Sequence, residues 1–429
     1  MANYLAIDGG VPLRAQPFPP WPQFDAATIQ AALEPLREGR TNYWGGTRGL
    51  AFQDRFAEYV GVSHAIAVNS GTSALHVALG ALGIGPGDEV IVPSYTFIAT
   101  AMCVLHQNAV PVFADVDAAT HALDPHDVVT RITPRTRAIL PVHLYGHPAD
   151  MGSIMEIAEQ HGLKVVEDCA QALGAKYGGR PVGSIGHINA FSFCQDKIIT
   201  TGGEGGMVTT DDDELAERAR SFKDHGYPET ERRQRFAEGA LHLYTHRSLG
   251  FNYRMTEMQA AIGLQELQKL DSWHLPRRAR NAEALTRELE GMAAIGLPIV
   301  RPGCTHAWYK YPILLDLDRL RCDREQFVKA VRAEGYPGCA LGDPAEGYLE
   351  EVFTNHAGYG SGGCPFTCPR NARAPDYTQA RCPVAADLGR RTVKLQVHPT
   401  MEPEDARDIG RIVRKVAERC PGLTGPPRP

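Results

Sequence analysis

The sequence lacks a long uninterrupted hydrophobic segment. Its longest uncharged apolar run, residues 90–105, contains Pro93 and two threonines, and it falls short of the roughly 20 residues that a membrane-spanning helix needs. We interpret this run as strand, turn and helix. No charged segment precedes an apolar stretch at the N-terminus, so a secretory signal is not expected. The sequence therefore predicts a soluble, cytoplasmic protein with no membrane partner.

A strong excess of one charge is also lacking. The chain has 44 Lys and Arg against 50 Asp and Glu, a net charge of −6. This balance gives no electrostatic argument for nucleic acid as a partner. The hydrophobic content of 43% and the length of 429 residues are typical of a globular protein with a large core. No internal repeat is evident.

Paired C-x-x-C spacing is absent, although the chain has ten cysteines. Cys364 and Cys368, with Cys339 and Cys382 further away, are the one group that could gather. Their scattered spacing, without a secretory signal, favours free thiols in a reducing compartment. We expect no structural metal site.

Strands and helices alternate through the first 270 residues, after a proline-rich, extended arm over 1–25. Strands are expected at 63–69, 89–92, 110–113, 138–142, 163–168 and 207–210. Helices are expected at 25–38, 70–82, 96–106, 153–160, 211–222 and 256–270. This alternation predicts an α/β fold with a large, mostly parallel sheet and helices on both faces. Ligands of such sheets bind beyond the carboxyl ends of the strands.

The pattern changes after residue 272. Helices are expected at 275–292, 323–334 and 402–419 and a strand at 308–314, with a Gly/Pro/Cys-rich insertion at 339–372. We predict a large domain over 1–272 and a smaller α+β domain over 273–429. Residues 225–250 show little apolar periodicity and are expected to form a long loop.

Residues 191–207 combine a short strand, a lysine and a glycine-rich turn. Ser192 alternates with two phenylalanines, and Lys197 follows before four glycines within five positions. A lysine held between a strand end and a tight turn suits covalent chemistry through its amine. A surface lysine in a hairpin is the alternative. A dinucleotide-binding loop at 202–206 is disfavoured, because these glycines precede a strand and open no helix.

Two further features suit the same chemistry. Residues 70–73, Ser-Gly-Thr-Ser, follow a strand and open a helix, which is the arrangement of a phosphate-binding site, although a plain N-cap gives the same pattern. Asp168 ends another strand. It is either a helix N-cap or a carboxylate placed where ligands of such sheets bind.

Five segments in order resemble the DegT/StrS family of pyridoxal-phosphate-dependent sugar and aminocyclitol aminotransferases. They are residues 69–75, 93–97, 167–171, 191–207 and 250–255. The resemblance covers about 17–416. It implies the fold type I architecture of such transferases and a homodimer with shared active sites.

The resemblance also implies roles for single residues. Lys197 would be the Schiff-base lysine and general base, Asp168 the partner of the pyridine nitrogen, and Gln171 a partner of the ring hydroxyl. The remaining cofactor contacts would be Gly71, Thr72 and Ser192 on the phosphate, Phe97 stacked on the ring, and Asn252 reaching the phosphate from the partner chain. Tyr309, His398 and Arg247 are candidate contacts of the amino acceptor, and each has an equally plausible structural role.

The implied reaction moves an amino group from L-glutamate or L-glutamine to a ketone. The acceptor would be a nucleotide-linked keto-sugar or a cyclitol ketone, in amino-sugar, antibiotic or surface-polysaccharide biosynthesis. A sugar dehydratase of this family commonly replaces the lysine, so Lys197 disfavours it. A non-enzymatic regulator is disfavoured because Asp168, Gln171 and Lys197 are all present. Residues 194–196 and the insertion at 339–372 depart from the family pattern, and the sequence does not choose the acceptor.

Overall fold

A seven-stranded sheet forms the centre of the computed structural model, which describes residues 4–239, 245–371 and 375–420. Across the sheet the strands are β1 (His64–Val68), β9 (Gly206–Thr210), β8 (Ile188–Ser192), β5 (Lys164–Asp168), β4 (Thr136–Ile139), β2 (Glu89–Pro93) and β3 (Val110–Ala114). Neighbours from β8 to β3 are parallel, whereas β9 runs antiparallel to both of its neighbours. The mostly parallel sheet is confirmed.

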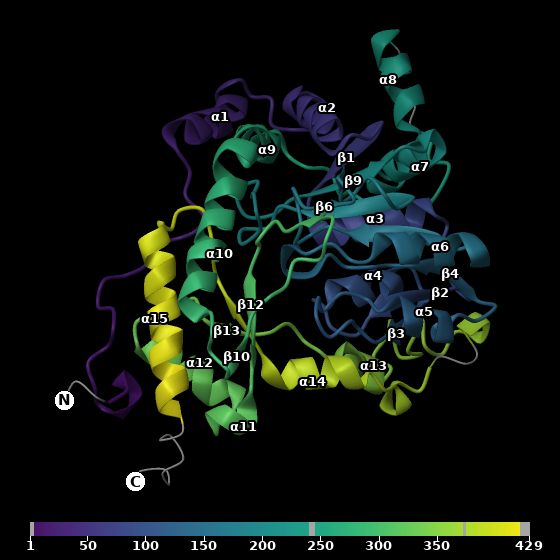
Figure 1. The fold of residues 1–429 in the computed structure, drawn as a ribbon. Helices are drawn as coiled ribbons and strands as arrows, with labels where there is room; N and C mark the ends of the chain where they lie inside the picture. The colour runs from purple at the N-terminus through teal and green to yellow at the C-terminus, as the bar shows by residue number, and fades with distance from the viewer. Residues whose placement is uncertain (1–3, 240–244, 372–374, 421–429) are drawn as a thin grey trace.

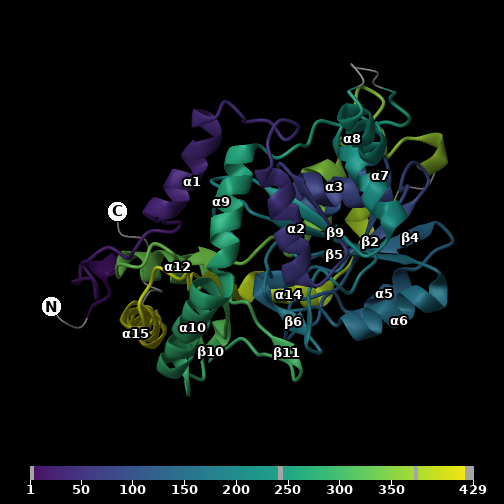
Figure 2. The same ribbon diagram turned by 90° about the horizontal axis from the view of Figure 1, so that it is seen from above.

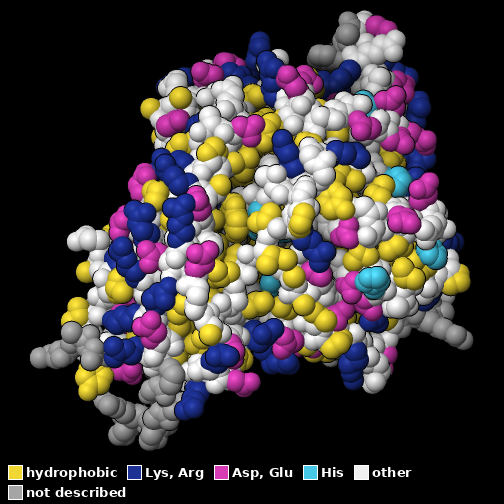
Figure 3. All heavy atoms as spheres, viewed as in Figure 1, with side chains coloured by type: hydrophobic (Ala, Val, Ile, Leu, Met, Phe, Trp, Pro, Cys, Tyr) yellow, Lys and Arg dark blue, Asp and Glu magenta, His cyan; other side chains and the backbone are white. Residues whose placement is uncertain are grey.

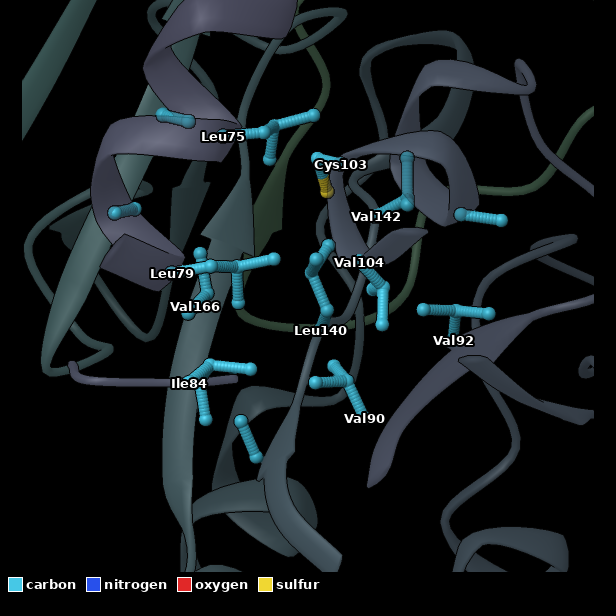
Figure 4. Packing of buried hydrophobic residues seen from close by; sticks show 14 of the residues in the cluster. Leu75, Leu79, Ile84, Val90, Val92, Cys103, Val104, Leu140, Val142 and Val166 are labelled. Atoms are coloured by element: carbon cyan, nitrogen blue, oxygen red, sulfur yellow. The ribbon is translucent and has the colours of Figure 1, made fainter. Parts of the chain in front are cut away.

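Helices cover both faces of this sheet (Figures 1 and 2). They are α2 (Arg48–Val60), α3 (Gly71–Ala81), α4 (Ala99–His106), α5 (Pro125–Arg131), α6 (Met151–His161), α7 (Asp213–Lys223) and α9 (Glu257–Gln268), and α1 (Ala26–Arg37) lies against α9. One hydrophobic cluster joins α3, α4 and α7 to the strands. A second cluster lies under α2 and α9, and a third lies under α5 and α6. Figure 4 shows Leu79 and Val104 of the first cluster lying close to Val166 and Leu140.

A second, antiparallel sheet lies beside the first. Its strands are β10 (Ile295–Gly296), β12 (Tyr311–Leu315), β14 (Thr392–Leu395) and β13 (Ala340–Leu341). Its helices are α10 (Leu275–Leu289), α11 (Leu317–Leu320), α12 (Arg324–Ala333) and α15 (Pro403–Arg419). They share one hydrophobic cluster and lie to one side of the molecule in Figure 1. A three-stranded sheet of β11 (Cys304–Thr305), β6 (Lys176–Tyr177) and β7 (Arg180–Pro181) links the two halves.

The insertion after residue 339 packs on the large sheet. Its part of the chain includes α13 (Glu351–Thr354) and leads to α14 (Pro383–Arg391). Tyr348, Phe353 and Tyr377 pack around Phe113 of β3, with ring centroids 5.1–5.9 Å apart. The insertion therefore covers an edge strand that would otherwise be exposed. Since chain beyond 272 joins both cores, the boundary at 272 stays a prediction.

The long loop expected at 225–250 contains a helix, α8 (Glu229–Ala237), which projects from the body in Figure 1. Residues 240–244 of this segment lie outside the described part. Its charged residues pair at helical spacing, as in Arg233 to Glu229 at 2.8 Å, and Glu229 also accepts a hydrogen bond from Tyr43 Oη at 2.8 Å. Such pairs stabilise a helix without any apolar stripe, which is why periodicity missed it.

The expectation that all cysteines are free is wrong for two of them. Cys322 and Cys420 form a disulfide with their Cα atoms 6.1 Å apart, inside the core of the small sheet. The other eight are free. Cys339 and Cys382 lie in different hydrophobic clusters, so the four cysteines proposed to gather do not share one site.

Within the described ranges, no helix is long and apolar enough to cross a membrane. On the face shown in Figure 3, acidic and basic side chains are interspersed.

Candidate active site

A cavity of about 410 Å³ lies beyond the carboxyl ends of the parallel strands, where the fold predicts a ligand site. Eight predicted residues line it: Gly71, Thr72, Phe97, Asp168, Gln171, Ser192, Lys197 and Tyr309. Its wall also includes Thr100, Cys194, Asp196, Glu204, Lys310, Asp343 and Lys394. Residues from both sheets therefore meet around one space.

Lys197 follows β8 and precedes a turn in which Gly202 and Gly203 have φ values of 87° and 135°, conformations that favour glycine. Its Nζ atom lies 4.9 Å from the centroid of the Tyr309 ring and has no hydrogen bond or ion pair with any described residue. Burial lowers the pKa of this amine, although the Asp168 carboxylate opposes the shift. A lysine amine that loses its proton readily is suited to act as a nucleophile or base.

Asp168 is the last residue of β5. Its Oδ2 accepts a hydrogen bond from Thr100 Oγ1 at 2.9 Å and its Oδ1 accepts one from the Ala170 backbone at 3.0 Å. Residues 169–175 form turns, so the alternative that Asp168 caps a helix is wrong. Burial raises the pKa of this carboxyl, although each of these two hydrogen bonds lowers it. A cation placed beside it would stabilise the ionised form.

The start of α3 offers free backbone donors to the cavity. Ser70 is the N-cap, as the plain interpretation predicted, and its Oγ accepts from Ser73 N at 3.1 Å. The N–H groups of Gly71 and Thr72 donate no hydrogen bond within the described chain. A Cβ on Gly71 would lie 2.6 Å from Ser192 Cβ, so glycine lets β8 end against this helix. Free donors and the positive end of the helix dipole make the start of α3 suited to an anion.

Gln171 connects the two sheets at the cavity. Its Oε1 accepts from the Tyr145 backbone at 2.8 Å, and its Nε2 donates to Asp343 Oδ2 at 3.3 Å. Asp343 in turn forms an ion pair with Lys394 of β14. The Phe97 side chain is 57% exposed at the same cavity, so one ring face is available for contact.

Asn252 and Arg247 do not line the cavity of the single chain. Asn252 is exposed, and its backbone forms a bridge with Asp224. The Arg247 guanidinium lies 2.7 Å from Glu231 of α8. Their predicted roles stay predictions.

His398 lies outside the cavity lining as well. Its ring stacks on Trp21 of the N-terminal arm with centroids 6.2 Å apart, and its Nδ1 is 2.7 Å from Thr400 Oγ1. Burial lowers its pKa to about 3, so the imidazole is neutral. Its role as an acceptor contact stays a prediction.

The sequence did not single out several residues of the cavity wall. Thr100, which holds Asp168, lies in the helix that follows a family motif, and Lys310 is the neighbour of the predicted Tyr309; both positions offered a signal. Asp343 and Lys394 offered none, since they stand 51 residues apart and pair only in the folded chain.

Comparison with known proteins identifies the class. The model of the DegT/DnrJ/EryC1/StrS aminotransferase family matches residues 22–367, and the chain belongs to this family. It is an aminotransferase-family enzyme with the aminotransferase fold.

Two curated relatives differ in the acceptor that their names print. The L-glutamine:2-deoxy-scyllo-inosose aminotransferase of Streptomyces kanamyceticus is 36% identical over 97% of this chain and 97% of its own. The UDP-N-acetyl-3-dehydro-alpha-D-glucosamine 3-aminotransferase of Acidithiobacillus ferrooxidans is 39% identical over 86% of this chain and 89% of its own.

Solved structures share the fold. DesV of Streptomyces venezuelae, in complex with a ketimine intermediate, has a TM-score of 0.79 and 36% identity, covering 94% of this chain and all of that one. NtdA of Bacillus subtilis, with bound pyridoxamine phosphate, has a TM-score of 0.77 and 25% identity over 94% of this chain and 86% of that one.

Proposed function

We propose that this aminotransferase uses pyridoxal phosphate to move an amino group from L-glutamate or L-glutamine to a ketone. The acceptor is a nucleotide-linked keto-sugar or a cyclitol ketone, the classes named for its relatives. The observation that carries the proposal is the Lys197 amine, which has no ion-pair partner among the described residues and shares one cavity with Asp168 and the start of α3. The reaction belongs to amino-sugar, antibiotic or surface-polysaccharide biosynthesis.

The residues present fit pyridoxal phosphate. The free N–H groups of Gly71 and Thr72, with the Ser192 hydroxyl, suit the phosphate. The buried Asp168 carboxylate suits a protonated ring nitrogen, and the exposed face of Phe97 suits the ring itself. A second proton on Gln171 Nε2 is available for the ring hydroxyl. When bound, the cofactor supplies a sink for the electrons released at the donor's Cα.

The chain's own residues perform the proton transfers. The amine of Lys197, whose pKa burial lowers, accepts the proton from the donor's Cα and returns a proton at the acceptor carbon. Thr100 and the Ala170 backbone hold Asp168 in one orientation. Tyr309 flanks the amine, with its ring centroid 4.9 Å from Lys197 Nζ.

A homodimer with shared sites belongs to the same proposal. Asn252 is exposed and lies outside the cavity of its own chain, a position open to a second subunit. The cytoplasmic location expected from the sequence stays a prediction.

The test supplies purified protein, pyridoxal phosphate and either donor. 2-Deoxy-scyllo-inosose and UDP-N-acetyl-3-dehydro-glucosamine represent the two acceptor classes, and release of the 2-oxo acid measures turnover. Turnover with either acceptor supports the proposal, and the acceptor that is used shows which of the two acceptor classes is the substrate.

Lys197→Ala is expected to abolish turnover and the violet absorbance of bound cofactor, because the variant lacks the one amine that is proposed to bond to the cofactor aldehyde. Lys176→Ala, on the exposed strand β6, is the matched control and should keep both. Substantial activity in Lys197→Ala would refute the assignment, and no turnover with either acceptor would refute the substrate class.

A further inference from the structure

Lys310 is a second lysine at the cavity, and the family motifs do not include it. It precedes β12, and its backbone N–H donates to the Tyr145 carbonyl at 3.2 Å, which fixes its position. Its Nζ atom lies 4.8 Å from the centroid of the Tyr309 ring, the same ring that Lys197 approaches. Two amino groups of one cavity therefore flank a single aromatic side chain.

The charge on Lys310 has no counter-ion among the described residues. Asp343 is paired with Lys394. Asp196 raises the pKa of Lys310 through its charge but forms no ion pair with it. Burial lowers the Lys310 pKa to about 8, with Arg278 and two cavity lysines adding to that shift. Carboxylates stand in the cavity wall, but none of them forms an ion pair with Lys310. A cation held against an aromatic ring at a cavity, without an ion-pair partner among the described residues, is available to an anionic group of a ligand.

We propose that Lys310 binds the α-carboxylate of the amino donor. This inference rests on the proposed function, because it takes an amino acid as the substrate of the first half-reaction. The reacting nitrogen of that donor must reach the place of the Lys197 amine, and its α-carboxylate is attached to the adjacent carbon. Lys310 shares the Tyr309 ring with Lys197, so one ligand can reach both. The proposed cyclitol ketones carry no carboxylate.

The test separates the two half-reactions in the cofactor-loaded protein. Lys310→Met keeps most of the side-chain stem and removes the charge, Lys310→Arg keeps the charge, and Lys176→Met is the exposed control. The absorbance change on mixing with L-glutamine or L-glutamate gives the donor affinity. The reverse change of the pyridoxamine phosphate form with ketone gives the acceptor affinity.

Loss of a charged hydrogen bond costs about 1.5–3 kcal/mol. We therefore expect Lys310→Met to weaken the binding of both donors by about 10- to 150-fold and to leave the step with the cyclitol ketone within twofold. Lys310→Arg should recover most of the loss. Calorimetric titration with glutarate, a dicarboxylate without an amino group, should show the same weakening without any turnover.

Three results would overturn the inference. They are unchanged donor affinity in Lys310→Met, equal losses in both half-reactions, and a loss confined to L-glutamate, which would place the side-chain carboxylate at Lys310. If Lys310→Met does not retain the violet absorbance of bound cofactor, Lys310→Gln takes its place. Its affinity for glutarate is then measured by calorimetric titration. If the control protein itself binds no cofactor, the proposed function fails first, and this outcome is distinct from the other three.

Discussion

Gly71 stands where the start of α3 meets the end of β8, and replacing it with alanine tests the proposed phosphate site. The added Cβ would lie 2.6 Å from Ser192 Cβ, 2.9 Å from its Oγ and 3.2 Å from its Cα. These atoms are at or next to the backbone, so no flexible side-chain end can move aside. Either the helix start or the strand end must shift.

Overpacking of this kind costs about 1–3 kcal/mol, and we expect the free energy of unfolding to fall by that amount. The same shift moves the N–H groups of residues 71 and 72 away from the Ser192 hydroxyl. If cofactor binding loses a similar energy, the dissociation constant of pyridoxal phosphate rises about 5- to 150-fold.

Titration with pyridoxal phosphate, followed by violet absorbance, measures this affinity, and thermal denaturation measures stability. Gly85→Ala is the control, since a Cβ there would meet nothing within 4 Å. Adding Ser192→Gly to Gly71→Ala removes the closest contacts and should recover part of the stability. Unchanged affinity in a destabilised Gly71→Ala protein would refute the phosphate assignment.

Two further predictions concern assembly and pH. If Asn252 serves the partner's site, mixing inactive Lys197→Ala subunits with Asn252→Ala subunits should restore turnover. One of the two sites in the mixed dimer then has both an intact Lys197 and an intact Asn252. No recovery after subunit exchange would assign Asn252 to the site of its own chain. Burial lowers the pKa of His121 to about 4. Between pH 6.5 and 4 the unfolded chain therefore binds a proton more readily than the folded chain does, and the free energy of unfolding decreases as the pH is lowered through this window. His121→Asn, which tolerates the φ of 62°, should lessen this fall by about 2–4 kcal/mol, and an unchanged pH slope of the unfolding free energy would contradict the reasoning.

The sequence predicted the large sheet because its strands are buried on both faces. Such strands appear as continuous apolar runs, as in Val165 and Val166 of β5, and they need no alternation. The helix α2 was not predicted, although Phe52, Phe56 and Val60 recur at helical spacing; here the signal was present. For α8 it was absent, because ion pairs at i,i+4 replace the apolar stripe.

The predicted part of the candidate site consists of residues inside short local motifs. Asp168 ends a strand, Gly71 begins a helix, and Lys197 precedes a glycine turn, so a stretch of a few residues fixes each position. Thr100 is a partner that tertiary packing brings to Asp168 from another helix, and its effect on the carboxyl depends on a contact that no local pattern contains.

The opposite wall of the cavity is built entirely from such distant contacts. Asp343 reaches Gln171 because its own backbone N–H donates to Tyr145 Oη at 3.0 Å and because Lys394 of β14 pairs with its carboxylate. Lys310 reaches the cavity because the Tyr145 carbonyl holds its backbone. Local motifs therefore indicate the amine chemistry of the site. The proposed donor contact, Lys310, and its neighbours Asp343 and Lys394 lie on or beside the small sheet, where packing between sheets decides their positions. We therefore expect substitutions at that wall to be the best test of substrate choice.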